Sequence, residues 1–464
     1  MSTLTDSKTG AWERFREQLQ AEVLSRLPEH VHRLSWSAEQ IQATQRQALR
    51  RLLAHAVKHS PYHRRRLAGL DVESIDPTQL PRLPVMSKTD MMAAFDEVLT
   101  DRRVTRAAIE HALALTKGKP VPVGGSCVAF ATGGASGPRG VLASDVEARS
   151  GFILSLLRPM IARLRAVGGP PPGGLAIAMV AASSAVHPSG AAAAETEGRE
   201  LPVRIHQVPV TFPLPEIVQR LNELQAPGLF GYPSMLVRLA AERRAGRLEI
   251  APIAITSTSE TLLPEVRETI GDAFGAPVVD TFASTEGLVG TSVPDDSVFV
   301  FNDDMCIIEL VDTNNQPVPP GVPSAKVLLT NLYNLLQPLI RYEINDIFIR
   351  QPDAPDHGHL RARVRGRADE VLRYDELDVH PHVVRSVLLR APRILDYQVR
   401  QTSHGIDLDV IADPDADLAT LTDQLVQALE QTGLSNPSVR VAAVQQLPRH
   451  PQTGKLSRFV PLSG

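Results

Sequence analysis

Apolar residues recur every three or four positions near the start of the chain. The series runs through Trp12, Phe15, Leu19, Val23 and Leu27. Because this spacing places all of them on one face, it predicts an amphipathic helix. Ser37 followed by Gln40 has the pattern of a capping box and predicts a second helix that continues towards His59. After a stretch with three prolines, a further helix is expected to hold Met91 and Phe95.

From about residue 120 the pattern changes to short apolar runs, each closed by Gly, Pro, Ser or Thr. The runs lie at 175–180, 229–230, 253–256 and 277–281, and helical stretches lie between them at 215–224, 234–244 and 264–274. Alternation of buried strands with helices predicts an α/β fold with a mainly parallel sheet. Residues 306–350 contain closely spaced strands, which predict a smaller β-rich subdomain.

The pattern starts anew after Gly366. A helix is expected at 381–391, two strands around 403–405, a helix at 417–432 and a strand at 439–444. This βαββαβ-like order is enough to fold as a separate α+β unit. The sequence therefore predicts a large N-terminal domain at 1–366 and a small C-terminal domain at 367–464.

Composition narrows the class of protein. The 464 residues carry 48 Lys and Arg against 52 Asp and Glu, so the near-neutral charge gives no support to a nucleic acid or an anionic membrane as the partner. Cys127 and Cys306 lie far apart in the sequence, which excludes a Cys-rich zinc site and suits a reducing cytoplasm. The start of the chain lacks a signal-peptide pattern. The most apolar run, 175–186, is too short for a membrane span, which needs about 20 residues. We therefore expect a cytoplasmic protein without a membrane segment.

Several common signatures do not occur in the sequence: G-x-x-x-x-G-K-[ST], G-x-G-x-x-G, H-E-x-x-H and G-x-S-x-G. This weakens the P-loop, dinucleotide-binding, zinc-protease and α/β-hydrolase interpretations. The chain does contain Thr132-Gly133-Gly134-Ala135-Ser136-Gly137 directly after an apolar run. Small residues allow backbone N–H groups to converge on a phosphate, although the same residues also suit a plain flexible turn.

A second polar segment ends an apolar strand. It reads Asp280-Thr281-Phe282-Ala283-Ser284-Thr285-Glu286-Gly287. Ligands of α/β proteins bind at the carboxyl ends of parallel strands, so this segment is a candidate binding site. By contrast, His187 lies in a loop rich in Pro, Ser and Gly, and we expect it to be exposed rather than catalytic.

These segments, in this order, resemble the motifs of the adenylate-forming superfamily of acyl-CoA synthetases and adenylation domains, and most closely its phenylacetate–CoA ligase-like branch. TGGASG resembles the phosphate loop, FASTE the Y-G-x-[ST]-E motif, PLIRYEIND the P-L-[IL]-R-Y-x-x-x-D motif, GRADE the hinge motif, and PQTGKLSR the terminal P-x-T-G-K-x-x-R. SPYHRRRL, LPVMSKTDM and GYPSMLVRLA are features of the branch. The resemblance extends from about residue 60 to the end.

The resemblance implies a two-step reaction: ATP and a carboxylate form an acyl-adenylate and pyrophosphate, and an acceptor then displaces AMP. Lys455 matches the catalytic lysine, which bridges the carboxylate and the α-phosphate. Glu286 would coordinate the Mg²⁺ that bridges the phosphates. Asp369 matches the hinge about which the small, mobile C-terminal domain turns between the two steps.

The remaining implied contacts surround ATP. Residues 132–137 would hold the β- and γ-phosphates, Phe282 would stack on adenine, and Asp346 would bind the ribose hydroxyls with Arg367 nearby. The ATP-binding set is Thr132, Gly133, Gly134, Ala135, Ser136, Gly137, Ser259, Glu260, Asp280, Thr281, Phe282, Ala283, Ser284, Thr285, Asp346 and Arg367. Ser259 and Glu260 stand where the branch lines the adenine pocket. Tyr232, in GYPS, is a candidate wall of the substrate pocket, and could also belong to the core or a turn.

Two positions depart from the family pattern. Ala135 replaces the first hydroxyl of the phosphate loop, which should weaken one phosphate contact by about 1 kcal/mol. Glu376 stands where the branch has a glycine that lets the pantetheine arm of CoA pass close to the backbone, with Asp375 and Asp378 beside it. Adenylation is therefore better supported than transfer to CoA.

The substrate is expected to be a small-molecule acid, aromatic or otherwise hydrophobic. CoA is the first candidate for the acceptor. The alternatives are an amine, a carrier-protein thiol, or nitrite activation that diazotises an aryl amine; a non-catalytic nucleotide sensor is a further interpretation from another class. ATP and Mg²⁺ are the expected cofactors, and the oligomeric state, monomer or homodimer, is left open.

Lysine usage supports the importance of one position. Only seven of the 48 basic residues are lysines, and after Lys326 only Lys455 remains. A chain that otherwise uses Arg keeps a compact, mobile ammonium inside P-x-T-G-K-x-x-R, where a planar guanidinium is a poor substitute.

Overall fold

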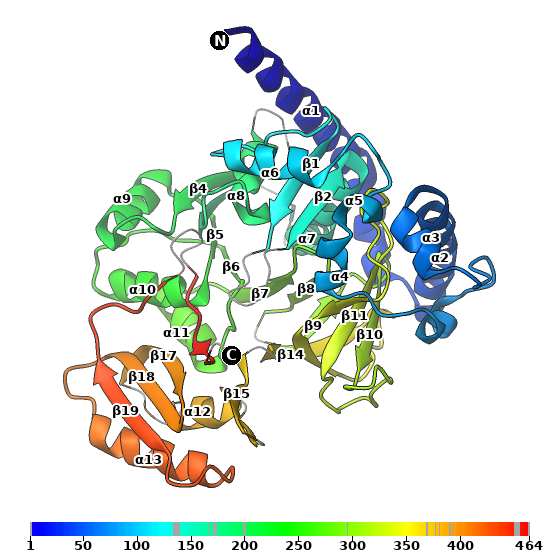
Figure 1. The fold of residues 1–464 in the computed structure, drawn as a ribbon. Helices are drawn as coiled ribbons and strands as arrows, with labels where there is room; N and C mark the ends of the chain where they lie inside the picture. Colours follow the sequence, from blue (N-terminus) through cyan, green and yellow to red (C-terminus); the bar gives the residue numbers. More distant parts are fainter. Residues whose placement is uncertain are drawn as a thin grey trace.

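The computed structural model describes residues 2–132, 140–166, 168–169, 174–197, 201–294, 296–367, 370–375, 377–379, 381–388, 391, 393–449 and 455–462. Within these residues, a large mixed sheet forms the centre of the molecule and a smaller α+β unit lies beside it at lower left in Figure 1. In the part of the chain that is described, no helix has both the length and the apolar character needed to cross a membrane.

Nine strands of the described residues form the central sheet, in the order β13-β14-β9-β8-β7-β6-β5-β3-β4. Their bounds are β3 Leu175–Ala181, β4 Val203–Pro209, β5 Gly228–Gly231, β6 Ala254–Thr258, β7 Val278–Ala283, β8 Val289–Ser292, β9 Phe299–Phe301, β13 Asp346–Arg350 and β14 Arg361–Arg367. Neighbours from β4 to β7 pair in parallel, and the remaining pairs are antiparallel. The expected parallel sheet is therefore present, extended by an antiparallel half.

Helices cover both faces of the parallel half. The bounds are α1 Ser2–His32, α7 Val146–Ala166 and α8 Pro188–Thr196 on one face, and α9 Leu214–Leu224, α10 Pro233–Arg244 and α11 Pro264–Phe274 on the other. Side chains alternate along β3, so that Leu175 and Ile177 pack towards α1, α7 and α8, whereas Ala178 and Val180 pack towards α9, α10 and α11. The five apolar residues that predicted the first helix are all buried on α1.

Shorter helices and smaller sheets complete this part. The remaining elements are η1 Arg33–Ser35, α2 Ala38–His59, α3 Pro61–Arg66, η2 Pro77–Arg82, α4 Lys88–Ala93, α5 Phe95–Val98, α6 Arg106–Leu115, β1 Cys127–Ala131, β2 Val141–Asp145, β10 Cys306–Val311, β11 Lys326–Asn331 and β12 Tyr342–Ile344. The capping box of Ser37 and Gln40 is present at the start of α2. The single helix expected around Met91 and Phe95 is two short helices, because the backbone leaves the helical region at Ala94.

The C-terminal unit has a hydrophobic core of its own. Its elements are β15 Leu372–Tyr374, β16 Leu377–Val379, α12 Pro381–Leu388, β17 Ile394–Thr402, β18 Gly405–Ala412, α13 Leu418–Glu430, β19 Ser438–Ala443 and β20 Phe459–Val460. A sheet in the order β19-β18-β17-β20 packs on the two helices through residues such as Val399, Leu408 and Leu425. Strand β20 begins four residues after Lys455, so this small sheet anchors the segment that carries the lysine.

Candidate active site

Four of the eight residues of the predicted polar segment 280–287 line one cavity at the carboxyl ends of β6 and β7. The cavity has a volume of about 200 Å³, and its walls include Ser259, Thr281, Ala283, Ser284, Thr285 and Lys455. Residues that the sequence analysis selected in three distant segments therefore lie at one site in the structure. Thr281 and Ala283 line the cavity while Asp280 and Phe282 do not, because successive side chains of a strand point to opposite faces.

Lys455 lies near both aromatic and charged groups. Its ammonium is 6.0 Å from the centroid of the Tyr232 ring. Burial lowers the pKa of Lys455, the negative charge of Glu260 opposes that shift, and the positive charge of Arg367 adds to it. Arg367 lies at the end of β14, Glu260 in the loop after β6 and Lys455 in the segment before β20. The C-terminal unit therefore inserts its lysine between elements of the large sheet.

Tyr232 is fully buried and precedes α10. Its hydroxyl accepts a hydrogen bond from the backbone N–H of Ala182 at 3.1 Å, and burial raises the pKa of the phenol to about 12. The ring thus stays neutral and fixed beneath the ammonium of Lys455. Tyr232 supports the cavity from behind and is not among the residues that line it.

Glu260 connects the large sheet to the C-terminal segment. One carboxylate oxygen accepts a hydrogen bond from the backbone N–H of Leu456 at 2.9 Å, and the other accepts one from the backbone N–H of Ser234 at 3.2 Å. Arg449 approaches the same carboxylate at 4.0 Å and donates to the hydroxyl of Ser234 at 3.0 Å. Glu260 therefore holds the residue next to Lys455, and does not face the cavity as its neighbour Ser259 does.

The turn after β7 positions Glu286. Gly287 has a φ of +105°, and its carbonyl accepts a hydrogen bond from the Tyr333 hydroxyl at 3.0 Å. The side-chain amide of Asn331 donates to the carbonyl of Glu286 at 2.9 Å. These contacts fix the backbone on both sides of Glu286 and leave its carboxylate partly exposed, next to the hydroxyl residues Ser284 and Thr285.

Phe282 belongs to an aromatic cluster. Its ring packs edge-on against Phe348, with 5.3 Å between the ring centroids, and against Phe301 at 6.0 Å and Phe299 at 6.5 Å. Phe282 remains partly exposed, so one part of the ring is left accessible. Asp280, two residues before it, is buried, and burial raises the pKa of its carboxyl to about 7.

Asp346 and Arg367 face each other across paired strands β13 and β14. The carboxylate of Asp346 and the guanidinium of Arg367 are 3.8 Å apart. Arg367 also acts on the pKa of Lys455, so the pair lies within electrostatic range of the lysine. The sequence-predicted ribose and phosphate residues are thereby on the same side of the molecule as the cavity.

Thr132 and Gly140 mark the two ends of the candidate phosphate loop. The backbone N–H of Thr132 donates to the carbonyl of Gly140 at 2.9 Å, and the Thr132 hydroxyl accepts from the N–H of Gly140 at 3.1 Å. Gly133, Gly134, Ala135, Ser136 and Gly137, together with the hinge residue Asp369 and the variant position Glu376, lie outside the described residues.

The sequence did not reveal the deeper walls of the cavity. They come from α1, α7 and α8 and are largely aliphatic, with one buried ion pair in which Arg149 binds both oxygens of Glu195 at 2.7 Å. The expectation that His187 is exposed was wrong: its side chain is buried at the cavity wall. A hydrogen bond between its Nδ1 and the carbonyl of Ala131, at 3.1 Å, holds the ring against β1. A signal in the sequence was the presence of arginines, 149 and 163 among them, within an apolar helical stretch.

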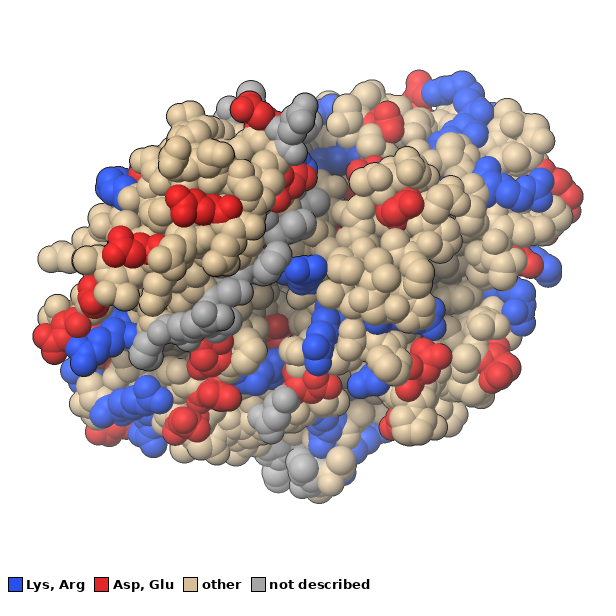
Figure 2. All heavy atoms as spheres, turned by 90° about the horizontal axis from the view of Figure 1, so that it is seen from below, with Lys and Arg blue, Asp and Glu red and all other residues tan. Residues whose placement is uncertain are grey.

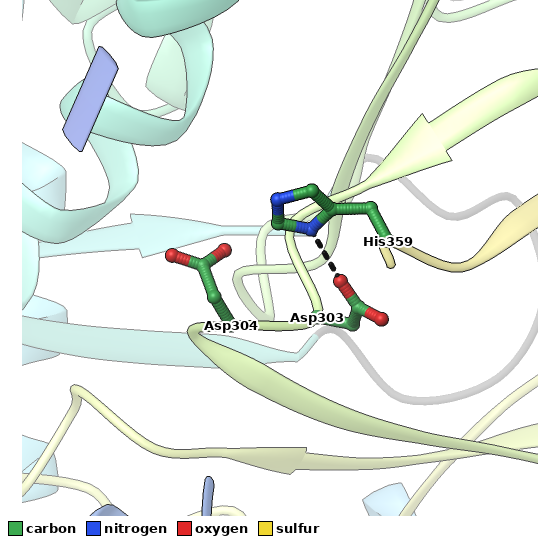
Figure 3. Close-up of side chains that lie close together, drawn as sticks. All are labelled: Asp303, Asp304 and His359. Atoms are coloured by element: carbon green, nitrogen blue, oxygen red, sulfur yellow. Dashed lines mark hydrogen bonds and ion pairs between the residues drawn. The ribbon is translucent and has the colours of Figure 1, made fainter. Parts of the chain in front are cut away.

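A separate cluster of Asp303, Asp304 and His359 has the composition of a metal site (Figure 3). Protein groups already occupy its ligand atoms. His359 meets Asp303 at 2.6 Å through Nδ1 and the carbonyl of Arg33 at 2.8 Å through Nε2, and Arg158 binds both oxygens of Asp304 at 2.6 and 2.8 Å. Burial alone would lower the pKa of His359, but the hydrogen bond and charge of Asp303 raise it. The cluster is a buried ion-pair network that joins η1 and α7 to the loops before β10 and β14.

The surface in Figure 2 shows how charge is distributed on the lower face. Acidic and basic side chains are interspersed there and do not gather into a patch of one sign. The net charge of the whole chain is also small, at −4, so neither observation indicates long-range steering of a charged ligand.

No protein-family model matches the chain. In sequence it is 24% identical over 378 residues to phenylacetate-coenzyme A ligase of Thermus thermophilus, an alignment that covers 78% of this chain and 78% of that protein. It is also 24% identical over 251 residues to protein CapK of Staphylococcus aureus, but this alignment spans 52% of the chain and only 54% of CapK.

In structure the chain is similar to 2-hydroxyisobutyryl-CoA ligase. The postadenylation state of that enzyme, in complex with 2-HIB-AMP, gives a TM-score of 0.69 at 20% identity, covering 94% of this chain and 91% of that one. Its thioesterification state, in complex with 2-HIB-AMP and CoA, gives a TM-score of 0.54 over 92% of this chain and 91% of that one. The fold of this chain therefore superposes better on the first of these two structures than on the second.

Proposed function

We propose that the chain is a phenylacetate–CoA ligase-like member of the adenylate-forming superfamily, which activates a hydrophobic carboxylic acid with ATP and transfers the acyl group to an acceptor. The observation that carries the proposal is the position of Lys455. Its ammonium reaches the cavity where the hydroxyl residues at the carboxyl ends of β6 and β7 converge.

The first step brings two anions together. A carboxylate oxygen of the acid attacks the α-phosphorus of ATP, the bond to the bridging oxygen breaks, and pyrophosphate leaves. Lys455 places a compact positive charge between the carboxylate and the α-phosphate, where negative charge develops. Burial lowers the pKa of Lys455 and the charge of Glu260 opposes that shift, as bound phosphates would also do.

ATP would lie along the cavity mouth. The loop that begins at Thr132 would hold the β- and γ-phosphates, Ser284 and Thr285 offer hydroxyls, and Asp346 would accept hydrogen bonds from the ribose. Phe282 has one part of its ring accessible for contact with adenine, and its other contacts with Phe301 and Phe348 would hold it in place. Asp369 would serve as the hinge.

Glu286 is the residue that fits Mg²⁺. A partly exposed carboxylate on a turn fixed by Asn331 and Tyr333 offers the oxygen ligand that Mg²⁺ prefers. The ion, when bound, neutralises charge on the phosphates as pyrophosphate departs. Glu286 would then orient the phosphate chain towards the carboxylate of the acid.

The acid substrate is proposed to be hydrophobic, since aliphatic residues, Met and Phe dominate the deep walls of the cavity. CoA is the first candidate acceptor because relatives in sequence and in fold are CoA ligases. An amine or a carrier-protein thiol is the alternative, favoured by Glu376 and the acidic residues Asp375 and Asp378 beside it. A bulky carboxylate there would hinder the phosphate-bearing CoA.

Acid-dependent exchange of labelled pyrophosphate into ATP tests the first step. A panel of aromatic and aliphatic acids should support exchange, and Lys455→Ala should reduce it by roughly a hundredfold or more, as for loss of a group that stabilises transition-state charge. Lys58→Ala, which changes an exposed lysine on α2, is the matched control and should leave exchange unchanged. Exchange that survives in Lys455→Ala, or that no acid supports in the parent protein, would contradict the proposal.

The acceptor is tested separately, with the acid that gives the fastest exchange. Incubation with CoA, with amines, with a carrier protein and with nitrite plus an aryl amine distinguishes the four products by mass. Rapid thioester formation with CoA would show that Glu376 does not block the pantetheine arm.

A further inference from the structure

The cavity continues well beyond the site of adenylation. It follows one stripe of α7 through Phe152, Ile153, Leu156, Leu157, Met160 and Arg163. These positions repeat with a spacing of three and four, so they share a face of the helix. From Arg149 to Arg163 the stripe rises through 14 residue steps, or about 21 Å at 1.5 Å per residue. The cavity is therefore long and narrow, and its middle is apolar.

Arg163 lies at the end remote from Lys455. Helix α7 is followed by β3, and the last turn of α7 lies near the amino-terminal edge of the sheet, where Leu201 and Val203 also line the cavity. Lys455 and Ser259 lie at the opposite, carboxyl-terminal edge. An acid whose carboxylate is at Lys455 would thus direct its other end towards Arg163.

Within the described part of the chain, Arg163 has no anionic side chain as a partner. Among the described residues, no carboxylate forms an ion pair with Arg163, and burial is the sole cause that lowers the pKa of its guanidinium. Two of the other arginines of α7 differ: Arg149 is paired with Glu195 and Arg158 with Asp304. A guanidinium at an apolar cavity wall loses hydration, and that loss is normally offset by an anion.

We propose that the acid substrate carries a second anionic group at its far end, and that Arg163 is the specificity-determining residue that binds it. This inference rests on the proposed function, because it assumes that the first carboxylate lies at Lys455. A guanidinium binds a carboxylate through two parallel hydrogen bonds, which gives both strength and orientation. The apolar walls between the two ends would select an aliphatic or aromatic spacer, so the substrate class is a long or aromatic dicarboxylic acid.

Matched pairs of acids test the proposal by pyrophosphate exchange. Each pair differs only in a distal carboxylate: octanoate with octanedioate, dodecanoate with dodecanedioate, and 3-phenylpropanoate with 3-(4-carboxyphenyl)propanoate. The protein should use at least one diacid with a kcat/KM about tenfold or more above that of its monoacid. Arg163→Met should abolish this preference by lowering kcat/KM for the diacid about tenfold, while the value for the monoacid stays the same or rises.

Three variants make the result specific. Arg165→Met removes an exposed arginine from the same turn of α7 and should behave like the parent protein. Arg163→Lys should keep part of the preference, since lysine keeps the positive charge but cannot form the two parallel hydrogen bonds of a guanidinium. Arg163→Glu should disfavour the diacids most strongly. Thermal unfolding of each variant checks that the fold is intact.

The outcomes separate this inference from the proposed function. Exchange with monoacids that equals or exceeds exchange with every diacid would overturn the role of Arg163 and leave adenylation standing. A diacid preference that persists in Arg163→Met would also overturn it. If no acid of either kind supports exchange, the proposed function itself fails, and with it the inference.

Discussion

The carboxylate of Glu260 accepts a hydrogen bond from the backbone N–H of Leu456 at 2.9 Å. Its other oxygen accepts from the N–H of Ser234 at the start of α10. One side chain, in the loop after β6, therefore binds the start of α10 and the C-terminal segment at the same time. Since Leu456 is the residue after Lys455, the position of the ammonium depends on an acceptor that belongs to the other part of the molecule.

Replacement of Glu260 should affect the first step more than the second. In Glu260→Gln one of the two acceptor oxygens becomes an NH₂ donor, which would face an N–H of Ser234 or Leu456, and one hydrogen bond is lost. We expect acid-dependent exchange to fall about tenfold or more, mainly in kcat, because Lys455 is held less firmly. Acyl transfer from a chemically prepared acyl-adenylate to the acceptor should change much less.

The control for this prediction is Glu268→Gln, which alters an exposed carboxylate on α11 and should change neither step. Equal losses in adenylation and in transfer would contradict the assigned role, as would full activity of Glu260→Gln in exchange.

The sequence predicted those features that depend on local pattern. The apolar series on α1 and the capping box of α2 are such features, because spacing and cap chemistry decide them within a few residues. Ser284, Thr285 and Lys455 line one cavity. Their proximity was predicted because several motifs follow one another in the order typical of a single family, and that order implies a shared site.

Other features depend on contacts between distant segments and could not be predicted in this way. Nothing near Glu260 in the sequence indicates that it binds the backbone at 456. The burial of His187 requires β1 beside the loop before α8, and the Arg158–Asp304 pair joins residues 146 positions apart. Helix α1, from the start of the chain, forms part of the deep wall of the cavity. No pattern near the site in the sequence therefore predicts how deep the cavity is.

Asp280 should make stability depend on pH. Burial raises the pKa of this carboxyl to about 7, well above the value near 3.9 of an unfolded chain. Between these values the native state holds a proton that the unfolded state releases, so this group contributes less to stability as pH rises from about 4 to 7. Asp280→Asn cannot ionise and should lose this dependence.

The measurement is urea denaturation of the parent protein and of Asp280→Asn at several pH values between 4.5 and 8. The free energy of unfolding of the variant, relative to the parent, should rise by roughly 2–4 kcal/mol across this window. Asp353→Asn, at an exposed position, should give a difference that is independent of pH. A flat difference for Asp280→Asn would show that its carboxyl is ionised in the native state throughout.

The Arg158–Asp304 pair should stabilise the fold through mutual neutralisation. Both side chains are buried, with oxygen–nitrogen distances of 2.6 and 2.8 Å. Asp304→Asn should lower the free energy of unfolding by about 3–5 kcal/mol, because it leaves a buried guanidinium without its charge partner. Arg158→Met should cost a similar amount.

A double-mutant cycle provides the check. The variant with both Asp304→Asn and Arg158→Met should be less destabilised than the sum of the single variants, with an interaction energy of about 1–3 kcal/mol. Strictly additive losses would mean that each residue acts through its other neighbours, such as Arg33 for Asp304.

Gly287 should be sensitive for two separable reasons, the sign of its φ and the space around it. Its φ is +105°, and a Cβ there would lie 2.3 Å from both the side-chain amide of Asn331 and the hydroxyl of Tyr333. Gly246 has a φ of +71° with nothing within 4 Å of a Cβ. Gly246→Ala therefore carries the backbone strain alone, and should cost about 1 kcal/mol of unfolding free energy.

Gly287→Ala adds a steric clash to that strain, so we expect a loss of roughly 2–5 kcal/mol. It should also lower pyrophosphate exchange and weaken the response to Mg²⁺, because the turn that carries Glu286 must move away from Asn331 and Tyr333. Glu286→Gln should lower exchange and the Mg²⁺ response to a similar extent while leaving stability nearly unchanged. If Gly287→Ala proved no less stable than Gly246→Ala, or kept full exchange, the turn would not be the rigid support for Glu286 that its contacts indicate.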